Sequence, residues 1–270
     1  MAIIYEPRGQ AREYAPLACN VYRGCDHGCV YCYAPSATQR QREQFHASCL
    51  RPNFFPQLVR EAKKRAATGD TGQVLLSFTC DPYQHLDVKE QVTRRTIEIL
   101  HQYGFTVQIL TKGGTRALRD IDLLGPGDAF ASTLTFVDEA RSREWEPDAA
   151  LPADRIEAIR AMHDAGVPTW VSLEPVIFPD ETLALIRQTF KFVDLYKVGK
   201  LNYHPHAASV DWYRFANDAV SLLKKTQVPF YVKDSLLPYL PADFEQQGMD
   251  HYQLAGGAPP KQQPLQPSLL

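Results

Sequence analysis

Short apolar segments alternate with amphipathic segments along most of this chain. Residues 73–81 (QVLLSFTCD), 105–112 (FTVQILTK) and 128–136 (DAFASTLTF) are rich in β-branched and aromatic residues, which predicts strands. The same composition predicts further strands at 16–22, 167–176, 192–200 and 229–236. Apolar residues at helical spacing predict helices near 55–68, at 88–104, after Gly113-Gly114, at 152–166, near 180–190 and at 211–225.

This alternation of strand and helix predicts an α/β fold in which a parallel sheet is covered by helices. No change of composition marks a second domain, so residues 1–256 are expected to form one barrel-like unit with an N-terminal extension. Residues 257–270 are rich in proline and glutamine and have few apolar anchors. This tail is expected to be extended or flexible.

The predicted strands share a polar carboxyl end. The residues concerned are Asp81, Lys112, Ser132 to Thr135, Glu174, Lys200, Lys233 and Asp234. Because the carboxyl ends of the strands form the active-site face of parallel α/β barrels, these side chains are expected to line one cavity.

Net charge and hydropathy bear on whether the protein binds nucleic acid or a membrane. The net charge of −2 gives no overall basic field for nucleic acid. Residues 36–65, however, carry seven basic side chains against two acidic ones, which indicates either a solvated helix face or, with nearby aromatic residues, a surface for single strands. No segment approaches the ~20 apolar residues of a membrane span, and residues 1–10 lack a signal-peptide pattern. A cytoplasmic protein with reduced thiols is therefore expected.

Three cysteines are concentrated in the segment NVYRGCDHGCVYCYAPS (20–36), with the spacing C-x3-C-x2-C. Cys25, Cys29 and Cys32 are one ligand short of a closed tetrahedral site. Three interpretations follow: structural zinc with Cys19 or His27 as the fourth ligand, incidental core thiols, or a [4Fe–4S] cluster with one open iron. Thiolates are suitable soft donors for such a cluster, and its open iron could bind S-adenosylmethionine (SAM) through amino and carboxylate groups.

The cysteine motif, followed by an aromatic residue at the first loop of a predicted barrel, resembles the signature of radical SAM enzymes. A closer resemblance is to the branch related to spore photoproduct lyase, loosely known as DNA repair photolyases. It extends over residues 14–236 and rests on NVYRGCDHGCVYCYA, on TCDPYQ (79–84) followed by TRRTIEIL, and on ILTKGG (109–114).

The resemblance implies a partial (β/α)6 TIM-like barrel that binds a [4Fe–4S] cluster and SAM. It implies reductive cleavage of SAM to a 5′-deoxyadenosyl radical, with the electron coming from a donor such as flavodoxin or ferredoxin. The three cysteines would ligate the cluster, and Tyr33 would lie near the adenine. Lys112 would contact the SAM carboxylate, Ser132 would hydrogen-bond SAM, and Asp81 would bind its amino group.

Two further residues are candidates on their own chemistry. Cys80 could donate a hydrogen atom to a substrate radical or simply fill the strand end as a small apolar residue. Spore photoproduct lyase has its donor cysteine at the position of Phe78, two residues earlier, and both positions share one face of a strand. Glu174 could contact SAM or substrate, or form a buried ion pair with Lys200.

The substrate is left open between two classes. Nucleic acid, in lesion repair or base modification, is one, and a protein or small molecule is the other. A zinc-bound interaction module is the alternative outside enzymes. No membrane partner is expected.

Overall fold

The computed structural model describes residues 2–245 and confirms the α/β fold. Its main sheet has the strand order β1-β2-β5-β6-β7-β8-β9-β10, in which only β1 runs antiparallel to its neighbour. The strands are β1 (Ile4–Tyr5), β2 (Leu17–Cys19), β5 (Gln73–Leu76), β6 (Thr106–Thr111), β7 (Ala129–Thr133), β8 (Thr169–Val176), β9 (Leu195–Lys200) and β10 (Phe230–Val232). A separate antiparallel pair is formed by β3 (Tyr22–Arg23) and β4 (Cys49–Leu50). Within residues 2–245 the edge strands β1 and β10 are not paired with each other, so the barrel is partial.

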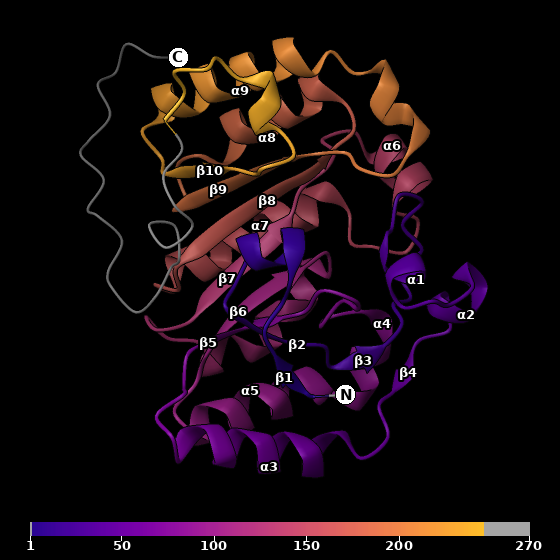
Figure 1. Ribbon diagram of the computed structural model, residues 1–270, viewed down its shortest axis with the longest axis vertical. Helices are drawn as coiled ribbons and strands as arrows, with labels where there is room; N and C mark the ends of the chain where they lie inside the picture. Colours follow the sequence, from indigo (N-terminus) through magenta and orange to yellow (C-terminus); the bar gives the residue numbers. More distant parts are fainter. Residues whose placement is uncertain (1, 246–270) are drawn as a thin grey trace.

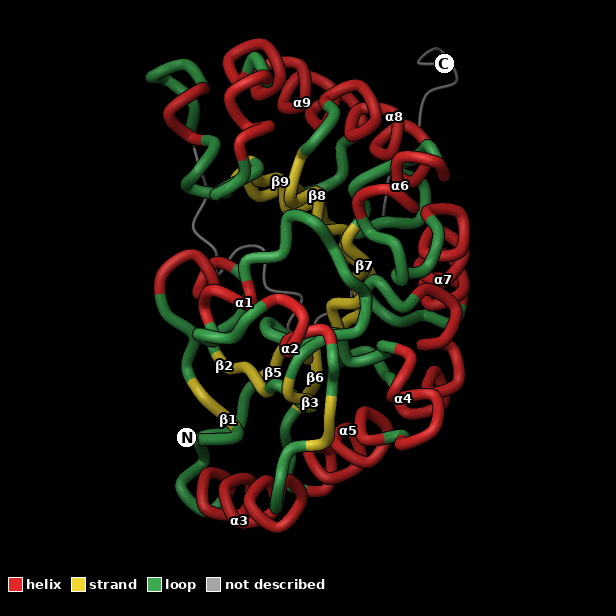
Figure 2. Tube along the Cα trace, turned by 90° about the vertical axis from the view of Figure 1, so that its right-hand side faces the viewer, coloured by secondary structure: helices red, strands yellow, loops and turns green. Residues whose placement is uncertain are grey.

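Helices cover the outside of the curved sheet, as Figures 1 and 2 show. The α-helices are α1 (Ala34–Ala37), α2 (Arg42–His46), α3 (Phe54–Ala66), α4 (His85–Glu90), α5 (Val92–Gln102), α6 (Glu139–Trp145), α7 (Pro152–Asp164), α8 (Pro179–Thr189) and α9 (Trp212–Thr226). The 3-10 helices are η1 (Gly9–Glu13), η2 (Gly114–Leu123), η3 (Pro205–Ser209) and η4 (Leu237–Tyr239). The short helices α1 and α2 lie in front of the strands in Figure 2, beside the open end of the barrel.

Local sequence explains where several elements begin and end. Pro152 occupies the first turn of α7, where its missing N–H costs nothing. The single helix expected at 88–104 is instead two helices, because Gln91 adopts a left-handed conformation with φ of 49° between α4 and α5. The strand expected at 73–81 ends at Leu76, and residues 77–81 form an irregular segment.

The two faces of the sheet bury different kinds of residue. Toward the helices lies a large core of branched and aromatic side chains. Inside the curve the residues are fewer and several are small, which leaves room for chain segments and ligands. This inner group comprises Tyr14, Ala15, Ala18, Leu75, Ala129, Ala131, Trp170 and Leu195.

The end of η1 and the residues that follow it occupy this inner space and link distant strands (Figure 1). The Tyr14 carbonyl accepts hydrogen bonds from Lys197 Nζ at 3.1 Å and Gln108 Nε2 at 3.3 Å. Glu13 Oε1 accepts hydrogen bonds from Asp234 N at 2.8 Å and from the Tyr231 hydroxyl at 3.3 Å. Burial and the neighbouring Lys233 ammonium hold the pKa of Lys197 well below its ordinary value. These contacts attach the N-terminal segment to β6, β9 and β10.

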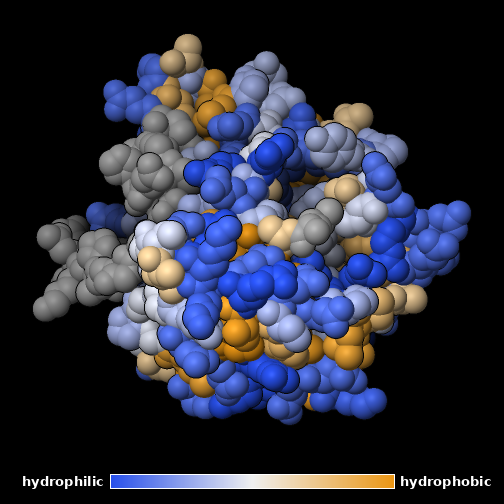
Figure 3. All heavy atoms as spheres, turned by 60° about the horizontal axis from the view of Figure 1, so that its bottom comes forward, coloured by the Kyte–Doolittle hydropathy of each residue, from blue (hydrophilic) through white to orange (hydrophobic). Residues whose placement is uncertain are grey.

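The outer face around α3 is mainly hydrophilic, with hydrophobic atoms in scattered patches (Figure 3). The cations near the end of α3 therefore lie on a solvated helix face, as one interpretation of residues 36–65 expected. No helix among residues 2–245 is long and apolar enough to span a membrane. The tail predicted at 257–270 lies outside the described residues, and the unit predicted over 1–256 is described only as far as residue 245.

Candidate active site

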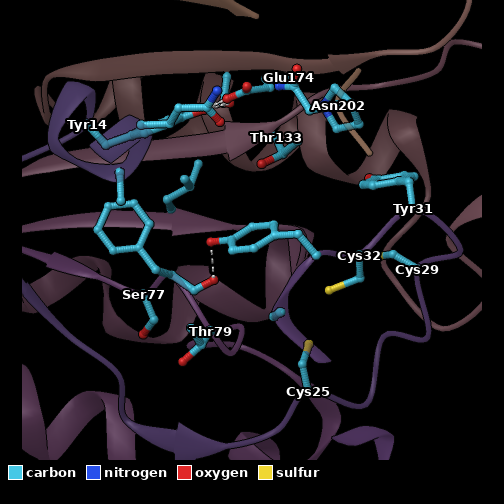
Figure 4. A pocket seen from close by; sticks show the side chains of 18 of the residues that line it. Tyr14, Cys25, Cys29, Tyr31, Cys32, Ser77, Thr79, Thr133, Glu174 and Asn202 are labelled. Carbon is cyan, nitrogen blue, oxygen red and sulfur yellow. Dashed lines mark hydrogen bonds between the residues drawn. The ribbon is translucent and has the colours of Figure 1, made fainter. Parts of the chain in front are cut away.

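A cavity of about 590 Å³ opens at the carboxyl ends of the strands. The polar strand ends predicted to line it do so on six strands or the loops that follow them, which confirms that expectation except for Ser132, Leu134, Thr135 and Asp234. These lining residues are Asp81, Lys112, Thr133, Glu174, Lys200 and Lys233. Figure 4 shows the three motif cysteines on one side of the cavity, with Tyr14 and Glu174 on the other.

The three cysteines lie on the loop between β3 and α1, and all three line the cavity as free thiols. The loop depends on Gly24, whose φ is +81°, because a Cβ there would lie 2.1 Å from the carbonyl oxygen of Phe45. That carbonyl accepts a hydrogen bond from the backbone N–H of Cys25 at 3.1 Å. The glycine in the motif thus allows α2 to pack directly on the cysteine loop.

Helix α2 contacts the backbone of all three cysteines. A ring nitrogen of His46 (Nδ1) lies 3.1 Å from the carbonyl oxygen of Cys25. The Arg42 guanidinium donates to the carbonyl of Cys29 at 2.9 Å and to that of Cys32 at 3.5 Å. One side of the cysteine loop is therefore fixed by residues 42–46.

The other side of the loop is held by residues 145–150. The backbone N–H of Val30 donates to the Trp145 carbonyl at 2.8 Å, and that of Asp148 donates to the His27 carbonyl at 3.2 Å. These bonds join the cysteine loop to the loop that follows α6.

A buried charge network supports this second contact. The Tyr31 hydroxyl donates to the Glu146 carboxylate, which also accepts a hydrogen bond from Arg155 Nη2 at 2.5 Å. Arg155 and Glu146 are each 1% exposed. Burial would raise the pKa of Glu146, but the Arg155 guanidinium and the Lys112 ammonium hold it below its ordinary value. The carboxylate is therefore ionised and orients Tyr31 between two of the cysteines.

The donor set suits an iron–sulfur cluster. Burial raises the pKa of all three thiols, that of Cys29 to about 12, so the free thiols are protonated and release protons when iron binds. Within residues 2–245 no group of three His, Cys, Asp or Glu side chains is placed to hold a single metal ion. A [4Fe–4S] cluster does not need such convergence, because each thiolate binds a different iron. Cys19 is one of the two candidates for a fourth zinc ligand. It is buried in the core, and burial raises its pKa.

Asp81 lines the cavity, but its oxygens are heavily used within the protein. Oδ1 accepts hydrogen bonds from Tyr83 N at 2.9 Å and Thr111 Oγ1 at 2.5 Å, and Oδ2 accepts one from Lys112 N at 2.6 Å. Burial would raise the pKa of Asp81, but the nearby His27 and these hydrogen bonds hold it below its ordinary value. Asp81 thus fixes the end of β6, and its contact with the SAM amino group remains a prediction.

Lys112 lines the cavity on the same side as the cysteines. Its ammonium lies 5.6 Å from the ring centroid of Tyr31, and among residues 2–245 no carboxylate pairs with it at salt-bridge distance. Burial would lower the pKa of Lys112, but Cys29 and Glu146 raise it above its ordinary value. The ammonium is therefore charged and accessible to an anionic group of a ligand.

The structure does not bring Ser132 to the cavity. Ser132 is fully buried, and its hydroxyl donates to the Thr111 carbonyl at 2.9 Å. Its neighbour Thr133 lines the cavity beside Ser172, its partner on β8. Side chains alternate along a strand, so a shift of one residue exchanges the faces. Thr133, not Ser132, is the β7 residue placed to meet a ligand.

Tyr33 and Cys80 both line the cavity. Tyr33 is 49% exposed, and its hydroxyl donates to the Phe78 carbonyl at 3.1 Å. Cys80 is 8% exposed and accepts a hydrogen bond from Tyr22 N at 3.4 Å. Burial raises the pKa of Cys80 to about 11, so this side chain is a protonated thiol at neutral pH.

Glu174 pairs with Lys233 and not with Lys200, which corrects the expected partner. Lys233 Nζ lies 2.6 Å from Glu174 Oε2, which also accepts a 2.5 Å hydrogen bond from the Tyr14 hydroxyl. Lys200 Nζ instead donates to the Tyr239 hydroxyl at 2.8 Å. The sequence places Glu174 and Lys200 on adjacent strands, but Glu174 reaches past β9 to the end of β10.

Several functional candidates escaped sequence reasoning. Tyr14 and Ser172 complete the polar wall around Glu174, and Tyr31 and Glu146 hold the cysteine loop. Tyr31 stood inside the cysteine motif, which was a usable signal. The other three come from segments without a motif, so only the fold brings them to the site.

Comparison with known proteins identifies the family. The model of the radical SAM superfamily matches residues 19–193. The chain is 24% identical over 193 residues to the uncharacterized protein MJ0683 of Methanocaldococcus jannaschii, with 70% of this chain and 71% of the relative covered. It is 28% identical over 168 residues to the uncharacterized protein Rv2578c of Mycobacterium tuberculosis, covering 58% of this chain. The chain matches 48% of that relative's length, about half.

Solved structures agree on the fold. Spore photoproduct lyase complexed with dinucleoside spore photoproduct has a TM-score of 0.65 at 13% identity, covering 84% of this chain and 78% of the lyase chain. SuiB of Streptococcus suis bound to S-adenosylmethionine has a TM-score of 0.59 at 12% identity, covering 84% and 53%.

This chain belongs to the radical SAM superfamily. Its cofactors are accordingly a [4Fe–4S] cluster and SAM. Its fold is the partial barrel of that superfamily.

Proposed function

We propose that this protein uses a 5′-deoxyadenosyl radical to abstract hydrogen from a nucleic acid, in repair or modification. The observation that carries the proposal is that the three motif thiols, the Lys112 ammonium and the Cys80 thiol line one cavity. The structural similarity to a lyase that binds a dinucleoside lesion supports a nucleic-acid substrate. At the rim, Tyr203 is 89% exposed and could stack on a base.

Cys25, Cys29 and Cys32 would hold the cluster, which would supply the one electron needed to split SAM at a C–S bond into methionine and the 5′-deoxyadenosyl radical. The protein's own residues position the reactants. The Lys112 ammonium binds the methionine carboxylate, and the ring of Tyr33 packs against the adenine. Tyr14 and Lys233 hold Oε2 of Glu174, and Oε1 accepts a hydrogen bond from a hydroxyl or amino group of SAM.

Cys80 supplies the returning hydrogen atom in this proposal. The thiol gives one proton and one electron to the substrate radical and becomes a thiyl radical. One electron from the external donor and one proton from solvent then restore the thiol. The place of Cys80 in the cavity supports this role, and burial, which raises its pKa, keeps it a protonated thiol.

The decisive experiment is anaerobic reconstitution with iron and sulfide, followed by dithionite, SAM and a deuterated single-stranded oligonucleotide. We expect 5′-deoxyadenosine that contains deuterium. Formation of 5′-deoxyadenosine without deuterium from any labelled oligonucleotide would contradict the nucleic-acid substrate. A colourless, zinc-loaded protein that never cleaves SAM would contradict the whole proposal.

Cys80→Ala is expected to leave SAM cleavage within about twofold of wild type while the yield of hydrogen-returned product falls at least about tenfold. Chromatography of both products from one reaction measures the two yields. Cys49→Ala is the control, because Cys49 is exposed and does not line the cavity. Equal losses of both products in Cys80→Ala would instead show that Cys80 only fills space.

Thr133→Val and Ser132→Ala separate the two candidates on β7. Loss of a hydrogen bond to SAM from Thr133 should weaken SAM binding about 3–10-fold, whereas Ser132→Ala should leave it unchanged. Equilibrium dialysis with labelled SAM measures the dissociation constants. Weaker SAM binding in Ser132→Ala with unchanged binding in Thr133→Val would show that Ser132 is the residue that binds SAM.

A protein or small molecule is the second candidate substrate, and the overall charge of −2 favours it. Binding to a single-stranded oligonucleotide should weaken steeply with salt if nucleic acid is the substrate. Lack of binding at low salt together with intact SAM cleavage would support the second candidate.

A further inference from the structure

The cysteine loop reaches the protein surface beside α2. Val30, which lies between two of the motif cysteines, is 43% exposed. Arg42 is also exposed, although its guanidinium donates to the carbonyls of Cys29 and Cys32. A single layer of side chains thus separates solvent from the backbone that carries these thiols.

The surface around this point is predominantly basic. Arg23 is exposed and immediately precedes Gly24, and Arg40 Nη1 lies 3.3 Å from the position that a Cβ of Gly24 would occupy. With Arg42, these residues define an arginine face. Glu43 is the exposed acidic residue on α2. The protein as a whole carries −2, so this excess of positive charge is local.

The nearby carboxylate of Asp26 is hydrogen-bonded to the first residues of α4. Both oxygens of Asp26 accept backbone hydrogen bonds, Oδ1 from His85 at 3.1 Å and Oδ2 from Leu86 at 3.1 Å. Because three arginines outnumber Asp26 and Glu43, the arginine face presents a local excess of positive charge to an approaching partner.

We propose that the arginine face, formed by Arg23, Arg40 and Arg42 over the cysteine loop, is the docking surface for an acidic one-electron carrier protein. The inference rests on the proposed function, since radical SAM enzymes need a reductant. Electron-transfer complexes are small and transient, so charge complementarity determines mainly how fast they form. The face lies directly over the backbone of the cluster ligands, which shortens the path for an incoming electron.

The test adds charge without removing any hydrogen bond of Arg40, Arg42 or Asp26. Gln41 and Gln44 are exposed on or beside α2, and their side chains make no hydrogen bond or ion pair within the described part of the chain. Gln41→Glu/Gln44→Glu removes the local excess of positive charge, and Gln41→Lys/Gln44→Lys increases it. Gln102→Glu/Gln188→Glu is the matched control, because these exposed glutamines lie on α5 and α8.

Stopped-flow absorbance would follow reduction of the reconstituted cluster by reduced flavodoxin, an acidic flavin protein, and separately by dithionite. The measured quantity is the rate with flavodoxin divided by the rate with dithionite, both at low salt. We expect Gln41→Glu/Gln44→Glu to lower this ratio about tenfold and Gln41→Lys/Gln44→Lys to raise it. The control should leave it unchanged, and 0.5 M salt should reduce the differences, because at roughly this concentration surface charges are strongly screened.

An unchanged ratio in Gln41→Glu/Gln44→Glu would overturn the docking surface, and so would an equal fall in the control variant. A loss of rate with both reductants leaves the ratio unchanged and counts against the proposal. Failure of the radical chemistry is visible separately, because the dithionite-reduced wild type would then not cleave SAM. Failure of the nucleic-acid substrate is visible as 5′-deoxyadenosine without deuterium from a labelled oligonucleotide.

Discussion

Arg155→Leu is expected to lower the free energy of unfolding by about 3–5 kcal/mol, because it leaves the Glu146 carboxylate buried without its cation. The pair joins two side chains that are each 1% exposed, at 2.5 Å. Arg155 Nε also donates to the Ala150 carbonyl at 2.6 Å, which fixes the loop next to the cysteines. Urea denaturation of the protein before cluster assembly measures the change.

A double-mutant cycle isolates this pair. Glu146→Leu alone should be similarly destabilising, since it leaves a buried guanidinium. The double variant Arg155→Leu/Glu146→Leu should lose less stability than the sum of the single variants. Additive losses would show that the ion pair is not what holds this region together.

The second large effect concerns the cluster ligands. Cys25→Ala, Cys29→Ala or Cys32→Ala should each abolish SAM cleavage, because an incomplete ligand set does not hold the cluster. Iron and sulfide content after anaerobic reconstitution and the yield of 5′-deoxyadenosine measure the two losses.

Cys19→Ala and Cys49→Ala are the matched controls for these variants. Both should retain iron and SAM cleavage, since neither cysteine lines the cavity. Full iron content in any of the three motif variants would remove that cysteine from the ligand set.

The fold could be predicted from the sequence because its strands and helices have strong, simple periodicities. The seven parallel strands were all anticipated. The errors were local: the conformation of Gln91 divides one helix, and β5 ends at Leu76 although apolar residues continue. The antiparallel β1 was missed, because a two-residue edge strand leaves no periodic signal.

Site residues that belong to a sequence motif could be predicted. Residues whose role depends on the direction of the side chain were missed. The cysteine spacing and the polar strand ends placed most of the cavity. Which residues of β7 face the cavity could not be inferred from the sequence. Ser132 and Thr133 are neighbouring hydroxyl residues, and their side chains point to opposite faces of the sheet. Likewise, Lys233 rather than Lys200 meets Glu174, since neighbouring strands in a curved sheet need not pair their terminal side chains.

The inner contacts of Glu13 and Tyr14 also constrain the order in which the molecule can be completed. Glu13 meets partners 218 and 221 positions later in the chain, and Tyr14 meets one 183 positions later. During synthesis these two residues leave the ribosome well before those partners do. The polar centre of the barrel therefore stays unfinished until β10 has emerged, and a nascent chain that stalls earlier exposes that centre to water.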